Sequence, residues 1–66
     1  MTITVNGECR AISTGATVQA LLTELKLEPV RVAVEVNENL VPRRSFEGTE
    51  IHDGDRVEVV TFVGGG

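Results

Sequence analysis

A single short amphipathic segment sets the strongest limit on how this chain can fold. Val18, Leu21, Leu22 and Leu25 are spaced as i, i+3, i+4 and i+7, so they form one apolar stripe along a predicted helix. Thr17 stands where a side-chain hydroxyl can cap the first turn. A helix with one stripe can cover only one partner surface, which favours a two-layer domain in which a sheet supplies that surface.

Most of the other apolar residues alternate with polar ones, as they do in half-buried strands. The alternation is clearest over residues 30–36, which contain four valines, and strands are also predicted over 2–6, 8–12, 40–41 and 56–62. The predicted order is therefore strand, strand, helix, strand, short strand, strand. The helix is expected to end before Pro29, and the segment 43–51 is expected to be an irregular loop.

Turn residues separate the predicted strands. Asn6-Gly7 is typical of a tight hairpin turn, Asp53-Gly54-Asp55 precedes the last strand, and Pro42 limits the short fourth strand to a sheet edge. At Asn37-Glu38-Asn39 a left-handed conformation is costly for Glu38, so we expect Asn39 to adopt it instead.

This order of elements predicts an α+β domain. A right-handed crossover would place the last strand parallel to the first, in the middle of the sheet. The predicted architecture is a β-grasp, or ubiquitin-like, fold: a mixed sheet of four to five strands with one main helix packed on one face. Residues 1–63 form the predicted domain, and 64–66 form a flexible C-terminal Gly-Gly-Gly tail.

Size and charge exclude several functional classes. A domain of 66 residues is too small to enclose a deep catalytic pocket of its own, and a net charge of −4 without a basic stripe argues against a nucleic-acid partner. No apolar run is long enough to cross a membrane, and no secretory signal is visible, so a cytoplasmic location is expected. The single Cys9 is expected to be a buried thiol in mid-strand, and the single His52 a solvated loop residue.

Two features near the C-terminus are candidates for function. Gly64, Gly65 and Gly66 lack side chains, so they can form a narrow segment that carries the Gly66 carboxylate into a partner's active site; the alternative is a frayed end or a cloning remnant. Val60 and Phe62 have the parity opposite to that of the core-facing valines of the last strand. Together with Val63 they predict a docking surface beside the tail, unless the strand twists and Phe62 packs at the core edge.

The chain also resembles the ThiS family, the ubiquitin-like sulfur carrier proteins of thiamine (thiazole) biosynthesis. The resemblance rests on Val5-Asn6-Gly7-Glu8, Val32-Ala33-Val34-Glu35-Val36-Asn37, Val41-Pro42-Arg43, Asp53-Gly54-Asp55-Arg56-Val57-Glu58-Val59-Val60 and Val63-Gly64-Gly65-Gly66. It extends over essentially the whole chain. One departure is the turn 37–39, where the family usually has Asn-Gly-Glu.

Membership would imply a carrier and not an enzyme. An E1-like adenylyltransferase (ThiF-type) would use ATP to convert the Gly66 carboxylate to an acyl-adenylate, and the chain itself would bind no cofactor or metal. Sulfur from a donor such as a cysteine desulfurase would then give a Gly66 thiocarboxylate, from which a thiazole synthase (ThiG-type) would take the sulfur. The free carrier is expected to be a monomer. The alternatives are a sulfur carrier of the molybdopterin synthase small-subunit type and a ubiquitin-like protein modifier.

Overall fold

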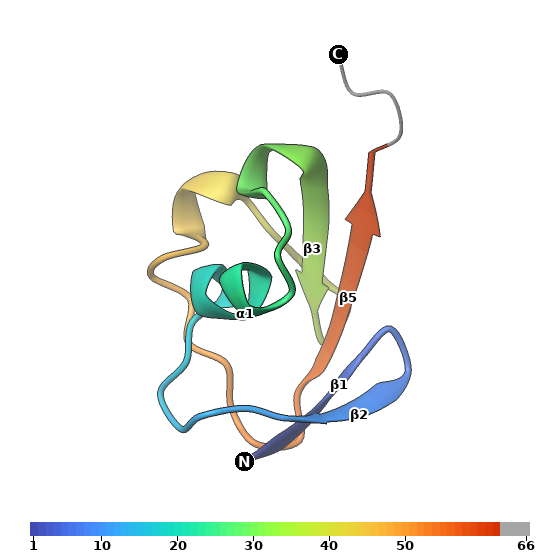
Figure 1. The fold of residues 1–66 in the computed structure, drawn as a ribbon, viewed down its shortest axis with the longest axis vertical. Coiled ribbons are helices and arrows are strands. Elements are labelled where there is room, and N and C mark those ends of the chain that lie inside the picture. The colour runs from blue at the N-terminus through green and yellow to red at the C-terminus, as the bar shows by residue number, and fades with distance from the viewer. Residues whose placement is uncertain (63–66) are drawn as a thin grey trace.

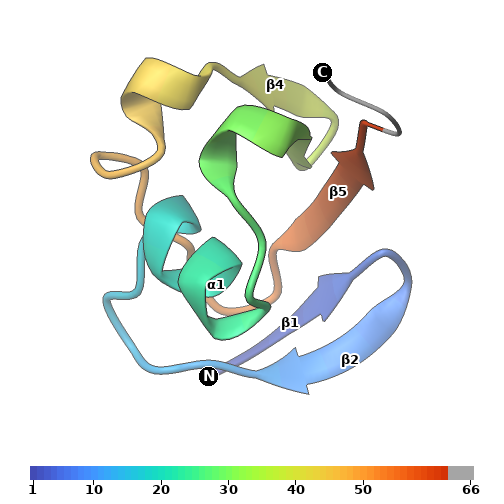
Figure 2. The same cartoon turned by 45° about the horizontal axis from the view of Figure 1, so that its top comes forward.

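The computed structural model describes residues 1–62 and consists of a five-stranded sheet with helices on one side (Figure 1, Figure 2). The elements in chain order are β1 (Thr2–Val5), β2 (Glu8–Ala11), α1 (Val18–Glu24), the 3₁₀ helix η1 (Pro29–Arg31), β3 (Val32–Val36), β4 (Asn39–Val41), the 3₁₀ helix η2 (Arg43–Ser45) and β5 (Arg56–Thr61). The strand order across the sheet is β2-β1-β5-β3-β4.

The last strand is the centre of this sheet. β5 runs parallel to β1, with Val5 opposite Val57, and antiparallel to β3, with Val34 opposite Val59. The short strand β4 lies at the edge, as the proline after it predicts. The predicted α+β β-grasp architecture is confirmed, including the parallel pairing of the first and last strands.

Both ends of the helix follow from local residues. The Thr17 hydroxyl oxygen accepts a hydrogen bond from the Ala20 backbone N–H at 3.1 Å, which confirms the predicted cap. The helix ends at Glu24, and the chain leaves it through Lys26 in a left-handed conformation with φ 61°. The predicted end before Pro29 is therefore correct.

The third strand begins two residues later than the valine alternation predicts. Val30 lies within η1 and is exposed, and β3 begins at Val32. The reason is Pro29, whose fixed φ suits the first turn of a helix and whose missing N–H cannot join a ladder. Alternation alone does not distinguish such a turn from the start of a strand.

The turn between β3 and β4 also differs from the prediction. Asn37 and Glu38 both have positive φ, 51° and 70°, whereas Asn39 is the first residue of β4. Because Val36 pairs with Asn39, only two residues remain for the connection, and a two-residue turn of this kind needs positive φ at both. The Asn37 side chain holds the turn in place: its Nδ2 donates to Asp55 Oδ1 and its Oδ1 accepts from Arg56 N, each at 3.0 Å.

Replacing Glu38 with glycine is expected to stabilise the fold by about 0.5–1 kcal/mol. Glycine removes the Cβ that makes a left-handed conformation costly, and this gain exceeds the entropy that glycine adds to the unfolded chain. Urea denaturation followed by circular dichroism measures the difference. Glu38→Ala is the matched control, because it also removes the exposed ion pair with Arg56 (3.6 Å) but keeps the Cβ. Equal effects of the two variants would contradict the backbone explanation.

The core lies between α1 and the sheet and includes two residues from the segment expected to be irregular. Phe46 and Ile51 are both buried, at 2% and 1% exposure. The segment is anchored because the Phe46 backbone carbonyl accepts from Gln19 N at 3.0 Å and the Ile51 N–H donates to Ala16 O at 2.8 Å. Within residues 1–62 the twelve buried apolar residues are Ile3, Ile12, Val18, Leu21, Leu22, Val32, Val34, Val41, Phe46, Ile51, Val57 and Val59.

Candidate functional site

The sheet face opposite α1 carries exposed apolar side chains near the end of β5. Along this strand Val57 and Val59 are buried toward the helix, whereas Val60 and Phe62 are 61% and 51% exposed. The exposure predicted for Val60 and Phe62 is therefore observed, and the alternative that Phe62 packs at the core edge is wrong. We call this helix-free side of the sheet the open face.

The register of the strands shows which residues are neighbours on the open face. Val60 lies opposite Ala33 of β3, and in the next row Glu58 lies opposite Glu35, which in turn lies opposite Leu40 of β4. Leu40 is exposed, and sequence reasoning did not select it. The sequence did contain an indication that Leu40 is exposed, because neighbouring residues of a strand point to opposite faces and Val41 is buried.

The central strand ends three residues before the first of the C-terminal glycines in the sequence. β5 ends at Thr61, and the Phe62 N–H still donates to Arg31 O at 2.8 Å, so Phe62 remains tied to the chain just before β3. The other predicted site residues, Val63, Gly64, Gly65 and Gly66, lie outside the described residues.

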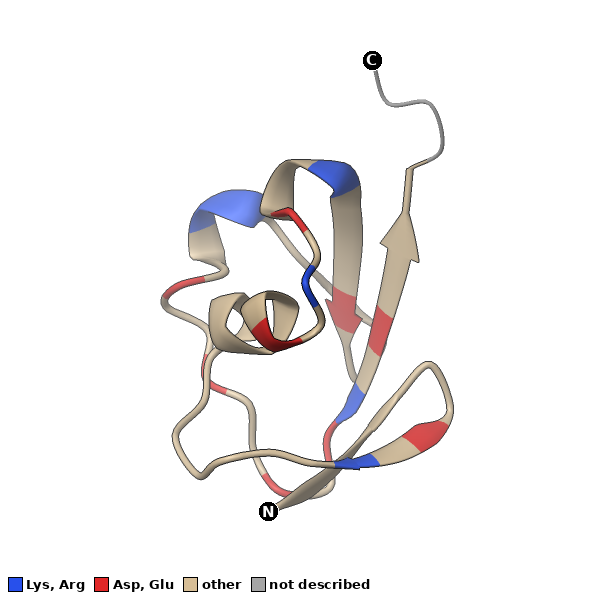
Figure 3. Ribbon diagram, in the orientation of Figure 1, with Lys and Arg blue, Asp and Glu red and all other residues tan. Residues whose placement is uncertain are grey.

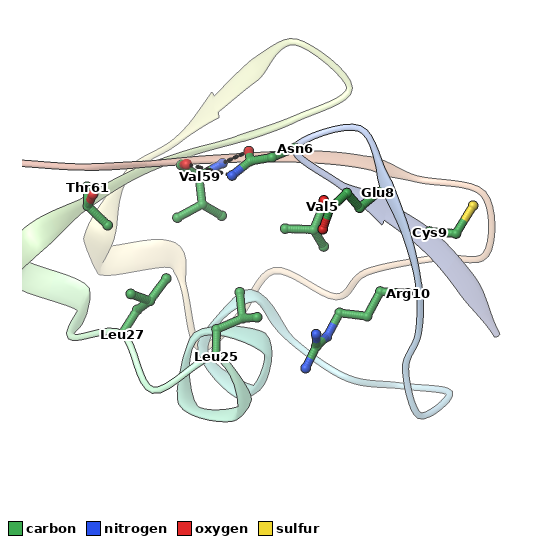
Figure 4. A pocket seen from close by; sticks show the side chains of 9 residues that line it. All are labelled: Val5, Asn6, Glu8, Cys9, Arg10, Leu25, Leu27, Val59 and Thr61. Atoms are coloured by element: carbon green, nitrogen blue, oxygen red, sulfur yellow. Dashed lines mark hydrogen bonds between the residues drawn. The ribbon is translucent and has the colours of Figure 1, made fainter.

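A groove of about 470 Å³ lies on the other side of the sheet, where β1 and β5 diverge (Figure 4). Backbone pairing between the two strands ends at Val5 and Val57, and the Asn6 side chain then bridges them. Its Nδ2 donates to Val59 O at 3.1 Å and its Oδ1 accepts from Val59 N at 2.8 Å. Val5, Leu25, Leu27 and Val59 supply the apolar walls. This groove was not predicted from the sequence.

Cys9 and His52, the two side chains considered for nucleophilic catalysis, do not form a site. The prediction that Cys9 is buried is wrong, because Cys9 is exposed. It belongs to the edge strand β2 and pairs with Thr4 of β1, so it lies on the sheet face opposite to that of the buried Ile3. His52 is exposed as predicted, and its Nδ1 lies 3.9 Å from Asp55 Oδ2. Residues 1–62 bring together no set of three His, Cys, Asp or Glu side chains suited to a metal ion. Among the helices of this range, none has the length and apolar character needed to cross a bilayer.

Comparisons with known proteins agree with this architecture. Over all 66 residues the chain is 46% identical to part of a thiazole synthase of Paramagnetospirillum magneticum, of which it spans only 20%. It is 40% identical over 50 residues to the sulfur carrier protein ThiS of Bacillus subtilis, and the match covers 76% of each chain. The crystal structure of the thiamine biosynthesis protein ThiS from Geobacter metallireducens matches with a TM-score of 0.85 and 38% identity over 100% of both chains.

The family model that matches agrees with these relatives and covers nearly the whole chain. It is the model of the ThiS family, and the match extends over residues 3–66, which includes all of the described sheet except its first residue, Thr2, and also the three glycines. A match of this extent, together with the shared fold, shows that the chain belongs to the ThiS family.

Proposed function

We propose that the chain carries sulfur as a thiocarboxylate on Gly66 and delivers it for thiazole formation in thiamine biosynthesis. One combination supports this proposal above all: a sequence of three glycines that begins three residues after the end of the central strand, and exposed Val60 and Phe62 near the end of that strand, in a chain of the ThiS family. The proteins named sulfur carrier protein ThiS among its relatives agree with it.

The proposed chemistry needs an activation step, because a free carboxylate is resonance-stabilised and a poor electrophile. A Gly66 carboxylate oxygen attacks the α-phosphorus of ATP, pyrophosphate leaves, and an acyl-adenylate forms. A persulfide sulfur of the donor then attacks the acyl carbon, AMP leaves with the electron pair of the broken C–O bond, and an acyl disulfide forms. A thiol then reduces the S–S bond of this intermediate, which leaves the thiocarboxylate on Gly66. ATP is bound by the E1-like adenylyltransferase (ThiF-type), and the carrier itself holds no cofactor. The sulfur comes from a donor such as a cysteine desulfurase.

The glycines and the open face have separate proposed roles. Gly64 and Gly65 pass through the partner's channel, because residues without Cβ occupy the least width. Val60, Phe62 and Val63 contact the partner beside the channel entrance and hold the Gly66 carboxyl group in position. The catalytic groups belong to the partner, so the carrier acts as a cosubstrate that is consumed and regenerated.

A thiazole synthase (ThiG-type) is the proposed acceptor of the sulfur. Proteins named thiazole synthase in two bacteria contain a segment that is 46% and 39% identical to this chain and forms about a fifth of their length. Joining a carrier-like segment to the enzyme raises its effective concentration at the active site, which is an advantage where the two must meet in each reaction cycle.

Intact-mass measurement tests the proposed chemistry. The chain is incubated with ATP, a sulfur donor and the adenylyltransferase encoded in the same genome, and we expect the mass change of one oxygen replaced by sulfur at Gly66. The thiocarboxylate form is then expected to support thiazole formation by the thiazole synthase. Stable attachment to target lysines without gain of sulfur would instead identify a protein modifier, and delivery only to a large molybdopterin synthase subunit would identify the other carrier type.

Phe62→Asp is expected to weaken binding to the adenylyltransferase at least tenfold while leaving the unfolding midpoint nearly unchanged. The substitution places a charge in an apolar contact, whereas the side chain is half exposed in the free chain. Calorimetric titration and urea denaturation measure the two quantities. The control is Ala20→Asp, which adds the same charge at an exposed position in the first turn of α1, where an acidic residue is tolerated. Unfolding of the Phe62 variant would contradict the surface role.

A further inference from the structure

One edge of the central strand loses its neighbouring strand before β5 ends. Backbone pairing of β5 with β1 stops at Val57, whose carbonyl accepts from the Asn6 N–H at 2.9 Å. At Val59 the Asn6 side chain takes the place of a strand, because its amide group pairs with both the N–H and the carbonyl of Val59. The end of β5 then extends past the tip of the β1–β2 hairpin (Figure 1, Figure 2).

Thr61 is the residue whose backbone this arrangement leaves unpaired. The Phe62 N–H donates to Arg31 O at 2.8 Å, so Phe62 faces the β3 side, and the backbone groups of Thr61 face the opposite side. Within residues 1–62 neither the N–H nor the carbonyl of Thr61 has a hydrogen-bond partner on that side. Thr61 is also exposed. A free donor and a free acceptor on a strand edge are what another strand pairs with.

This edge lacks the features that usually prevent strand addition. Exposed edges are commonly protected by charged side chains, by proline or by being very short. The two outer edges of the sheet have such protection, because β2 contains Glu8 and Arg10, and β4 has three residues and is followed by Pro42. Figure 3 shows that the charged positions of β5 lie in its first half, and residues 59–62 are all uncharged.

Hollows on both faces of the sheet adjoin the unpaired edge and indicate which side chains fit there. On the helix side, the groove of about 470 Å³ has Leu25 and Leu27 in its wall together with Thr61 (Figure 4). On the open face, a second hollow of about 550 Å³ extends over β1 and β5 as far as Val60. Because the side chains of a strand point alternately to its two faces, an added segment would place apolar side chains in the groove and beside Val60.

We propose that an extended apolar segment of the thiazole synthase adds to the sheet at Thr61 as a further strand beside β5. The inference rests on the proposed function and deepens it, because it names how the sulfur acceptor holds its carrier. The relatives favour this partner: two proteins named thiazole synthase contain, in the same polypeptide, a segment 46% and 39% identical to this chain. Backbone pairing would fix the direction of β5 relative to the enzyme, three residues before the glycines.

Amide hydrogen exchange of the isotope-labelled carrier, read by NMR after a quench, tests the added strand directly. In the free chain we expect the Thr61 amide to exchange faster than that of Val60, which faces β3. In complex with the thiazole synthase encoded in the same genome, the protection factor of Thr61 is expected to rise at least about tenfold, because its N–H becomes bonded. An unchanged Thr61 in a complex that forms would overturn the inference, as would strong protection of Thr61 in the free chain.

Thr61→Pro tests the same edge by mutation. Proline removes the free N–H without removing a hydrogen bond within residues 1–62, and an edge position of this kind tolerates it. Calorimetric titration is expected to show at least about tenfold weaker binding to the thiazole synthase, because one ladder bond is lost and the ring obstructs the added strand. The unfolding midpoint in urea should stay close to that of the wild type. If this variant does not fold, the exchange of Thr61 in the wild type decides.

The matched control is Thr61→Ala, which removes the same side chain but keeps the N–H, so its affinity is expected to stay within about twofold of the wild type. Equal weakening by alanine and proline would assign the effect to the side chain and overturn the inference. If the wild type gains sulfur but only the adenylyltransferase protects Thr61, the carrier function stands and the inferred partner is wrong. If the wild type gains no sulfur, the proposed function fails and the inference fails with it.

Discussion

Deletion of Gly66 is expected to lower thiocarboxylate formation by at least about a hundredfold while leaving the fold unchanged. The deletion withdraws the terminal carboxyl group by about 3.3–3.6 Å, the length of one extended residue. A misplacement of only about 1 Å at a reacting centre can reduce a rate by about 10². Intact-mass measurement after incubation with ATP, the sulfur donor and the adenylyltransferase reports the product directly.

The matched control for this deletion is Gly48→Ala. A Cβ at Gly48 would have Ser45 O as its nearest neighbour, at 4.0 Å, so alanine fits there without strain. We expect the control to gain sulfur as the wild type does, and both proteins to unfold at the same urea concentration as the wild type. Undiminished sulfur gain in the shortened chain would refute the proposed role of Gly66.

Phe46→Ala is expected to destabilise the protein by about 3–5 kcal/mol, the usual cost of removing a buried aromatic ring. The ring is 2% exposed and belongs to the single core between α1 and the sheet. The total stability of a domain is commonly about 5–15 kcal/mol, and a chain of this size is at the low end of what one core can support. A large fraction of the Phe46→Ala protein should therefore be unfolded at 37 °C.

Urea denaturation followed by circular dichroism measures this loss at 25 °C. Val30→Ala is the control, because Val30 is 59% exposed in η1 and its truncation should change the free energy of unfolding by less than about 0.5 kcal/mol. A loss below about 1 kcal/mol in Phe46→Ala would mean that the segment after η2 is not part of the core.

The alternation of apolar residues was sufficient to predict most of the sheet. In β5 it correctly separated buried Val57 and Val59 from exposed Val60 and Phe62, because side chains of a strand point alternately to its two faces. The burial of Phe46 could not be predicted this way, because its segment has no period and is fixed by backbone contacts with the start of α1.

The predictions for residues at the margins of the pattern were wrong for a different reason. Parity along β2 places Cys9 on one of the two sheet faces, but only the pairing of Cys9 with Thr4 shows that this is the face without a helix, where the thiol is exposed. The left-handed conformation of Glu38 follows from the pairing of Val36 with Asn39, which is a property of two strands and not of the turn residues. The opposition of Glu35 and Glu58 likewise depends on a register between segments more than twenty residues apart.

The central place of β5 also determines how the molecule responds to mechanical force. A partner that withdraws from Gly66 pulls along the axis of this strand, and β5 is hydrogen-bonded to β1 on one side and β3 on the other. Such a load acts in shear, so the bonds along both neighbours must rupture together instead of unzipping one at a time. Under the proposed function, this arrangement would let the chain resist tension applied at Gly66 when it passes from one enzyme to the next.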